Sequence, residues 1–213
     1  MARQRRRCRR SWTNCWVVED FDALLREIRA CQVCEAYLPL GPRPVVHIAP
    51  TARLLIASQA PGTKVHATGI SFNDASGDRL RTWLGMSRAQ FYDERLVAIV
   101  GSGLCYPGRL ANGGDAPPRP ECAPLWRERI LAALPDIELT LLVGSYAQNL
   151  ALGPGKMGER VREFRSYLPR YLPLPHPSWR TGAWEKANPW FGDELLPVLQ
   201  ARVAELTHGG RHS

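Results

Sequence analysis

The feature that most limits the possible folds is a set of short, almost purely apolar segments. Residues 53–57, 96–100 and 138–143 are runs of Leu, Ile, Val and Ala with little polar alternation, and residues 171–175 form a fourth run, Tyr-Leu-Pro-Leu-Pro. A strand with one wet face would alternate apolar and polar residues, whereas continuous apolar runs are typical of strands buried on both faces. The runs therefore predict the strands of a mainly parallel sheet.

The segments between these runs have helical periodicity. Apolar residues recur every three or four positions in 126–134, after Pro124, and in 195–206, as expected for helices that bury one face. Alternating strands and helices predict an α/β fold, with a central, mainly parallel four-stranded sheet flanked by helices on both faces. Ligands bind such sheets beyond the carboxyl ends of the strands, so we expect the site in the loops that follow the runs.

Positive charge is concentrated at the N-terminus. The 213-residue chain has a formal net charge of +8, and six arginines lie within its first ten residues. We expect residues 1–18 to form a basic, disordered arm, residues 19–208 a single domain and residues 209–213 a tail. No apolar run approaches the ~18 residues of a membrane span, which predicts a cytoplasmic protein without a membrane partner.

Four of the six cysteines form a pattern that suggests a metal site. Cys31 and Cys34 are separated by two residues, and Cys105 and Cys122 by sixteen. A structural zinc ribbon normally supplies two close pairs, so four thiolates around an iron-sulfur cluster fit this spacing better, with zinc as the alternative. The spacing alone leaves open that Cys105 and Cys122 are ordinary buried thiols.

Several common enzyme signatures are absent from the sequence. The segment Gly153-Pro-Gly-Lys156 lacks both the upstream glycine and the following Ser or Thr of a phosphate-binding loop. The dinucleotide-binding, nucleophile-elbow and zinc-deaminase motifs are also incomplete. These absences exclude the corresponding motif-defined classes of enzyme.

Two of the strand-end loops resemble the uracil-DNA glycosylase superfamily. Residues 59–62, Gln-Ala-Pro-Gly, and the segment 69–78, which runs from a Gly-x-x-Phe sequence to a small-residue helix start, are similar to its first motif. Residues 176–178, His-Pro-Ser, are similar to the motif that ends its last strand. The cysteine spacing is similar to that of bacterial groups in this family that hold a structural 4Fe-4S cluster away from the active site.

The resemblance implies hydrolysis of an N-glycosidic bond in DNA. The nucleotide must leave the base stack and enter a pocket, where Phe72 would stack on the base. His176 would hydrogen-bond the departing base, and Asp74 would orient water or stabilise the cationic sugar. Without the resemblance, Phe72 would be interpreted as a core residue, and the competing interpretation of Asp74 is an ordinary helix cap.

The resemblance also assigns the remaining contacts. The base would be bound by Gln59, Ala60, Pro61, Gly62, Phe72, Gly101 and Ser102. DNA would be contacted by Lys64, Ser178, Trp179 and Arg180, with Trp179 inserted into the vacated stack.

Two departures from the family pattern leave the preferred base open. Ala60 stands where strongly active branches have Asp or Asn, and Gly101-Ser102 stand where several branches have an Asn that reads the base. Hypoxanthine or xanthine could therefore replace uracil. We predict a monomeric, nucleoid-associated base-excision repair glycosylase whose partner is DNA containing a damaged base; the alternative is a DNA-binding or damage-sensing module without cleavage activity.

Overall fold

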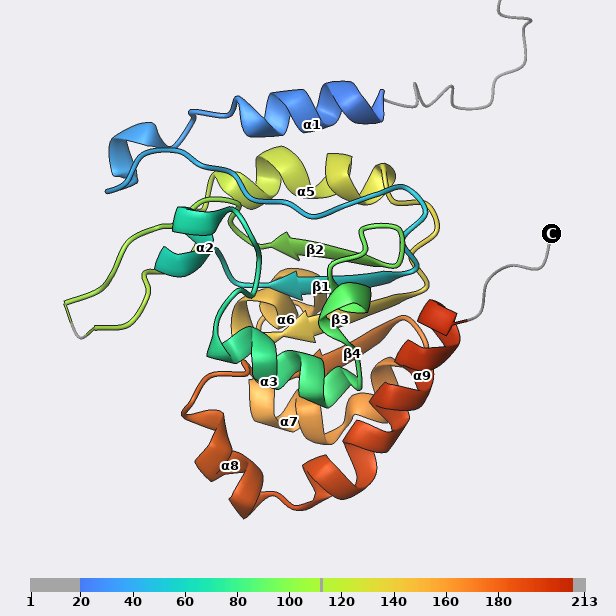
Figure 1. The fold of residues 1–213 in the computed structure, drawn as a ribbon. Coiled ribbons are helices and arrows are strands. Elements are labelled where there is room, and N and C mark those ends of the chain that lie inside the picture. The colour runs from blue at the N-terminus through green and yellow to red at the C-terminus, as the bar shows by residue number, and fades with distance from the viewer. Residues whose placement is uncertain (1–19, 112, 209–213) are drawn as a thin grey trace, which may run out of the picture.

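The computed structural model describes residues 20–111 and 113–208, so the predicted arm and tail lie outside the described part (Figure 1). Its sheet has four parallel strands in the order β2-β1-β3-β4. The predicted fold class is confirmed, and the apolar runs match the observed strands to within one residue at each end. The strands are β1 (Leu54–Ser58), β2 (Val97–Gly101), β3 (Leu139–Val143) and β4 (Tyr171–Leu174).

Helices connect the strands and cover the sheet. The two helical patterns seen in the sequence correspond to α5 and α9, although α5 begins before Pro124, which a first helical turn tolerates. The α-helices are α1 (Phe21–Arg29), α2 (Thr63–Thr68), α3 (Ala75–Leu84), α4 (Arg88–Phe91), α5 (Cys122–Ala132), α6 (Gly144–Leu152), α7 (Met157–Arg162), α8 (Thr181–Ala187) and α9 (Leu196–His208), with short turns η1 (Glu35–Tyr37), η2 (Phe164–Tyr167) and the π-helical η3 (Phe191–Leu195).

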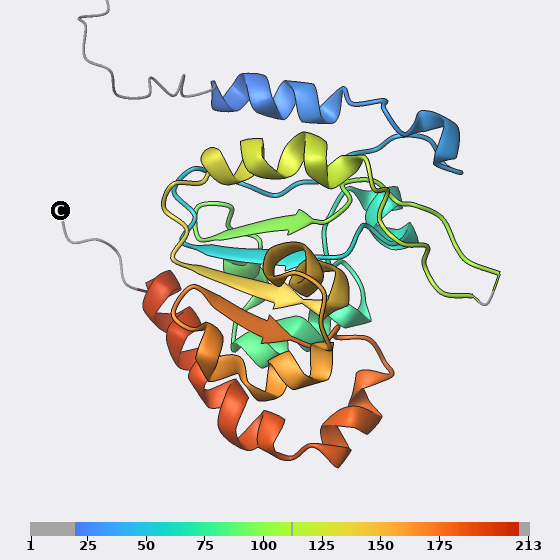
Figure 2. The same cartoon turned by 180° about the vertical axis from the view of Figure 1, so that it is seen from behind.

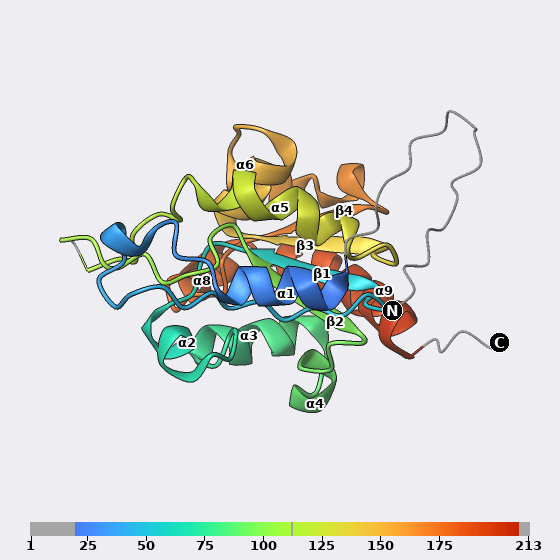
Figure 3. The ribbon, with the colours of Figure 1, turned by 90° about the horizontal axis from the view of Figure 1, so that it is seen from above.

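The helices form a layer on each face of the sheet. Seen from above, α5 and α6 lie on one side of the strands and α3 and α4 on the other (Figure 3). The view from behind shows α6 crossing in front of β1 and β3, while α1 lies beside α5 beyond β2 (Figure 2). Each strand is therefore covered on both sides, which explains its continuous apolar composition.

Successive residues of β1 contribute to different halves of the core. Leu54 and Ile56 belong to the cluster that includes residues of α3 and α9, whereas Leu55 packs with residues of α1 and α5. In the parallel register, Ile56 pairs with Ile99 of β2 and with Leu141 of β3. This alternation fixes the register because a shift by one residue would exchange the two faces.

All four strands end at the same edge of the sheet, as Figure 1 shows by the direction of the arrows. The loops that follow β1, β2 and β4 meet at this edge and contain most of the residues that the sequence singled out. Within residues 20–111 and 113–208, none of the helices combines the length and apolar character needed to cross a membrane.

Candidate functional site

A cavity of about 210 Å³ lies at the carboxyl edge of the sheet. Its walls come from the loops after β1, β2 and β4 and from the start of α3. Its size suits a single nucleobase-sized ligand rather than an extended one. The cavity brings together the predicted residues Gln59, Ala60, Pro61, Gly62, Phe72, Asp74, Gly101, His176 and Ser178.

Phe72 has an unusual backbone conformation at this cavity. Its φ is +53°, and it is the one residue other than glycine with a positive φ in the described part of the chain. Its ring is partly buried and meets Phe91 edge-to-face, with centroids 6.2 Å apart. A bulky side chain in this region of φ is costly and is retained mainly at functional sites.

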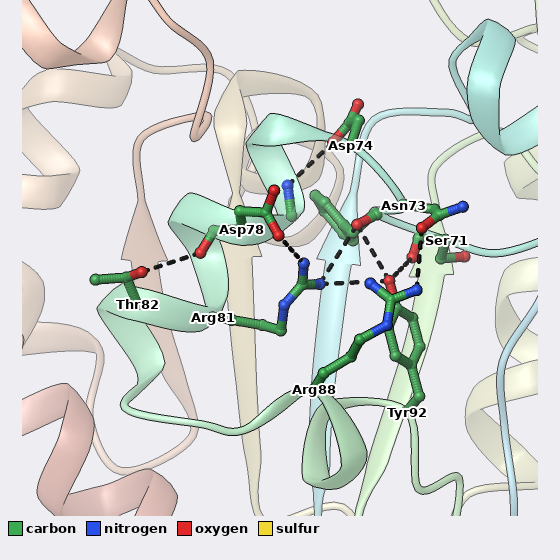
Figure 4. Close-up of polar contacts among 10 residues, drawn as sticks. Ser71, Asn73, Asp74, Asp78, Arg81, Thr82, Arg88 and Tyr92 are labelled. Atoms are coloured by element: carbon green, nitrogen blue, oxygen red, sulfur yellow. Dashed lines mark hydrogen bonds and ion pairs between the residues drawn. The ribbon is translucent and has the colours of Figure 1, made fainter.

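Two polar side chains hold this backbone in place (Figure 4). The carbonyl oxygen of Phe72 lies 3.1 Å from the Tyr92 hydroxyl and accepts a 3.5 Å hydrogen bond from Nη1 of Arg81. The same hydroxyl donates to the carbonyl of Ser71 at 2.8 Å and accepts from Arg81 at 3.4 Å. Phe72 is thus tied to α3 and to the residue that follows α4.

Arg81 is itself fixed by its surroundings. Its side chain is nearly buried, forms an ion pair with Asp78 one turn earlier in α3, and lies 5.3 Å from the centroid of the Phe91 ring. On the same side of the site, Arg88 donates to the side chain of Asn73 at 3.1 Å (Figure 4). The loop that carries Phe72 is therefore anchored by two arginines, of which Arg81 is held in the core and Arg88 lies at the surface.

Asp74 both caps a helix and lines the cavity. It is the N-cap of α3, and its Oδ1 accepts a hydrogen bond from the backbone N–H of Gly77 at 3.0 Å. The two roles considered from the sequence are therefore compatible, because the cap orients the carboxylate at the cavity wall.

Gly77 has no room for a side chain. A methyl group on its Cα would lie 1.7 Å from the carbonyl oxygen of Phe72. The close approach of α3 to the Phe72 carbonyl requires glycine here, and this explains why glycine occurs so early in a helix despite its low helix propensity.

His176 reaches the cavity from the loop after β4. Its carbonyl accepts hydrogen bonds from the backbone of Ser178, at 2.8 Å, and from the Thr181 hydroxyl. Gly144, at the start of α6, has φ +84°, a conformation that favours glycine, and a methyl group there would lie in ordinary contact with His176, 3.4 Å from its Cβ. Two prolines flank the residue, so a compact turn sets its direction.

The electrostatic environment favours a neutral imidazole. Burial lowers the pKa of His176 below its ordinary value of about 6.5, and the nearby carboxylates of Asp74 and Asp115 offset only part of this effect. The ring is therefore uncharged at neutral pH and can donate a hydrogen bond without bringing a positive charge to the cavity.

Asp115 is a cavity residue that the sequence did not predict. This residue lies in the loop between β2 and α5, lines the cavity, and faces Gly62, where a methyl group would lie 3.7 Å from its Oδ2. Its loop is joined to the first one because the Gln59 side chain donates to the carbonyl of Ala116 at 3.4 Å. The surrounding Gly- and Pro-rich stretch has no periodicity, so the sequence offered no signal for it.

One predicted base-binding residue lies elsewhere. Ser102 is absent from the described walls of this cavity; its hydroxyl donates to the carbonyl of Ser58 at 2.8 Å, and it borders a separate apolar cavity near α5 and α6. Its hydroxyl therefore stabilises the end of β1 and does not face the space that would hold the base. The role predicted for Ser102 stays without geometric support.

The predicted DNA-contacting side chains lie outside the cavity, apart from Ser178. Trp179 is 78% exposed, and the Arg180 guanidinium lies 4.9 Å from its ring centroid. Lys64, in the first turn of α2, is also exposed. These positions leave the three side chains available to a macromolecule docked over the cavity.

The four patterned cysteines line one pocket. Cys31 and Cys34 follow α1, Cys105 lies in the loop after β2, and Cys122 is the first residue of α5. Burial raises the pKa of Cys105 and of Cys122 to about 11, and burial together with the Glu121 carboxylate raises the pKa of Cys34. The pattern therefore corresponds to a spatial cluster, separate from the base-sized cavity.

One comparison with known proteins bears on this arrangement. The model of the uracil DNA glycosylase superfamily matches residues 45–200. The match includes every residue that lines the cavity, together with Cys105 and Cys122, whereas Cys31 and Cys34 precede it.

Gly77→Ala tests the contact between α3 and Phe72. We expect the free energy of unfolding to fall by about 2–3 kcal/mol, because the new methyl group forces the helix away from the Phe72 carbonyl. Gly158→Ala is the matched control, because this helical glycine has open space around it. Since alanine is the better helix former, we expect the free energy of unfolding of this variant to rise by up to about 1 kcal/mol. Urea unfolding measures both, and equal stabilities would contradict the proposed close contact.

The pKa of His176 can be measured from the NMR titration of its ring protons. We expect a value below about 6.5, and a lower one in Asp74→Asn, which removes a carboxylate that raises this pKa. The pKa of His176 is lower in the folded than in the unfolded protein. The neutral imidazole therefore contributes to the free energy of unfolding above pH ~6.5, and this contribution is lost as the pH falls through the pKa of the folded protein. A value above 6.5, or no change in the variant, would contradict the assignment.

Proposed function

The chain belongs to the uracil DNA glycosylase superfamily, and from this and its cavity we propose that it is a DNA glycosylase of base-excision repair. It would hydrolyse the N-glycosidic bond between deoxyribose and uracil or another deaminated base. Such an enzyme would act as a monomer on DNA in the cytoplasm, at the nucleoid.

The observation that carries this proposal is the convergence of three side chains on one cavity. Phe72 follows α2, Asp74 begins α3 and His176 follows β4, yet all three line the same base-sized space. An aromatic ring, a carboxylate and a neutral imidazole are the groups required to hold a base, stabilise a cationic sugar and assist a departing base.

Binding would begin with extrusion of the nucleotide from the duplex. Unstacking costs a few kcal/mol, and stacking on Phe72 returns ~1–3 kcal/mol. The rigid backbone of Phe72 helps because its ring does not have to be ordered when the base arrives. Trp179, exposed beside the cavity, would fill the gap left in the stack.

Bond cleavage would use groups on both sides of the cavity. As the C1′–N bond breaks, its electron pair moves to the base, and the ring N–H of His176 would hydrogen-bond the base oxygen on which charge develops. The Asp74 carboxylate would stabilise the cationic sugar and accept a proton from the water whose oxygen bonds to C1′. Lys64 and Arg180 would bind the flanking phosphates.

Two of the predicted base-binding positions have no polar side chain. Gly101 and Ala60 line the cavity without side chains that can hydrogen-bond a base edge. We propose a base range that includes hypoxanthine and xanthine besides uracil. Because Ala60 departs from the strongly active pattern, the second candidate is a DNA-binding or damage-sensing module of the same fold.

We further propose that Cys31, Cys34, Cys105 and Cys122 hold a 4Fe-4S cluster. The four thiols line one pocket, yet no set of three or more His, Cys, Asp or Glu side chains among residues 20–111 and 113–208 is arranged to hold a single metal ion. A cluster spreads its ligands over four irons, which suits these cysteines better than zinc. Its role would be structural, joining the segment after α1 to α5.

Base release tests the proposed activity. Oligonucleotides containing uracil, hypoxanthine or xanthine, single- and double-stranded, are incubated with the protein and cleaved with hot alkali at abasic sites. We expect strand breaks with the native protein, and single-turnover rates about 10²–10⁴-fold lower in Asp74→Asn and His176→Ala. Asp193→Asn, an exposed change outside the cavity, should retain the native rate. Salt-dependent binding without breaks would favour the module instead.

Visible absorption and metal analysis test the cluster. We expect brown protein containing iron, and loss of colour and iron in Cys31→Ser and Cys122→Ser, each of which removes one thiolate ligand. Cys15→Ser, outside the set of four, should retain both. Stoichiometric zinc without iron would contradict the proposal.

A further inference from the structure

The cavity that would receive the base is acidic, although the protein is basic. Its walls include the carboxylates of Asp74 and Asp115, and no Lys or Arg side chain is among the described residues that line it. The chain as a whole has a net charge of +8 and a pI of about 9.5. The charge of the cavity therefore differs in sign from the charge that would attract DNA.

Asp115 is held at the cavity by its loop. Two backbone contacts hold the two arms of this loop together. Arg109 pairs with Asp115, and the N–H of Ala116 donates a 2.9 Å hydrogen bond to the carbonyl of Gly108. The Gln59 side chain joins Ala116 to the loop after β1. Figure 1 shows this loop running from β2 past α2 before it returns to α5.

The two carboxylates are not neutralised by neighbouring cations. No ion pair with Lys or Arg is found for either one in residues 20–111 and 113–208. Asp74 has a second role as the cap of α3, whereas no hydrogen bond is found for the Asp115 side chain in the same residues. Asp115 is therefore the carboxylate most available to a bound base.

A carboxylate accepts hydrogen bonds and attracts positive charge, but it donates nothing. It favours a base that carries a positive charge or several N–H donors, and it disfavours one that carries a negative charge. N-alkylated purines such as 7-methylguanine in DNA are cationic, hypoxanthine is neutral, and xanthine readily loses a ring proton near neutral pH. The cavity should rank these bases in that order.

We infer that Asp115 is a specificity-determining residue that directs the cavity toward cationic, N-alkylated purines. The inference rests on the proposed glycosylase function and names its substrate class. Hydrolysis of such a nucleotide needs little help to the leaving group: as the C1′–N9 bond breaks, its electron pair neutralises the cationic base. The water oxygen bonds to C1′ and its proton passes to Asp74, so the products are a neutral base and an abasic sugar.

The experiment measures free bases released from DNA. Duplex DNA treated with dimethyl sulfate supplies 7-methylguanine, and oligonucleotides supply hypoxanthine, xanthine and uracil; mass spectrometry quantifies each base after subtraction of a protein-free control. We expect native protein to release 7-methylguanine faster than xanthine. Asp115→Asn should lower the ratio of the 7-methylguanine rate to the xanthine rate by about tenfold or more, because it removes one negative charge a few ångströms from a cationic ligand. Asp115→Lys should lower it further.

The controls separate this inference from the proposed function. Asp193→Asn, the same chemical change on an exposed residue outside the cavity, should leave the ratio unchanged. Release of uracil or hypoxanthine without 7-methylguanine, or an unchanged ratio in folded Asp115→Asn, would overturn the role of Asp115 and leave the glycosylase function intact. Release of no base from any substrate would overturn the glycosylase function itself.

Discussion

The geometry of the site depends on the left-handed backbone of Phe72. A non-glycine residue in this conformation costs on the order of 1–2 kcal/mol, so neighbouring groups must hold it. Arg81 and Tyr92 supply hydrogen-bonding groups at its carbonyl, and Gly77 leaves the space for that carbonyl to reach α3. Since Arg81 also contacts the buried ring of Phe91, and the Phe72 ring meets that ring edge-to-face, the position of the Phe72 ring is set by the core.

The opposite wall is fixed in a different way, through the ends of two strands. Gln148 of α6 is fully buried, and its Nε2 donates to the carbonyl of Leu174 at 3.0 Å and approaches that of Leu142 at 3.4 Å. This side chain joins the carboxyl ends of β3 and β4 just before His176 leaves the sheet. The imidazole and the aromatic ring thus belong to separately anchored elements, and the sheet between them sets their separation.

The parts of the fold that the sequence predicted are those controlled by burial. The strands were predicted because their apolar runs are long enough to exclude other structures, and Phe72, Asp74 and His176 because they lie in family-like segments near strand ends. Asp115 was missed because it comes to the cavity through loop closure by Gln59, a contact with no sequence pattern. The base-binding role predicted for Ser102 stays a prediction: its hydroxyl donates to the Ser58 carbonyl at the end of β1, a local contact that no sequence pattern indicates.

The opposite charges of the surface and the cavity act over different distances. Salt screens exposed charges beyond about 8–10 Å, so in the proposed complex with DNA an exposed cation such as Lys64 would mainly favour the approach of phosphates. In the same proposed complex, Asp74 and Asp115 would act at contact distance, where a bound duplex would exclude water and strengthen their field. Under the proposed function, a basic protein with an acidic cavity would attract every stretch of DNA and still discriminate among extruded bases, because attraction and selection would rely on separate sets of charges.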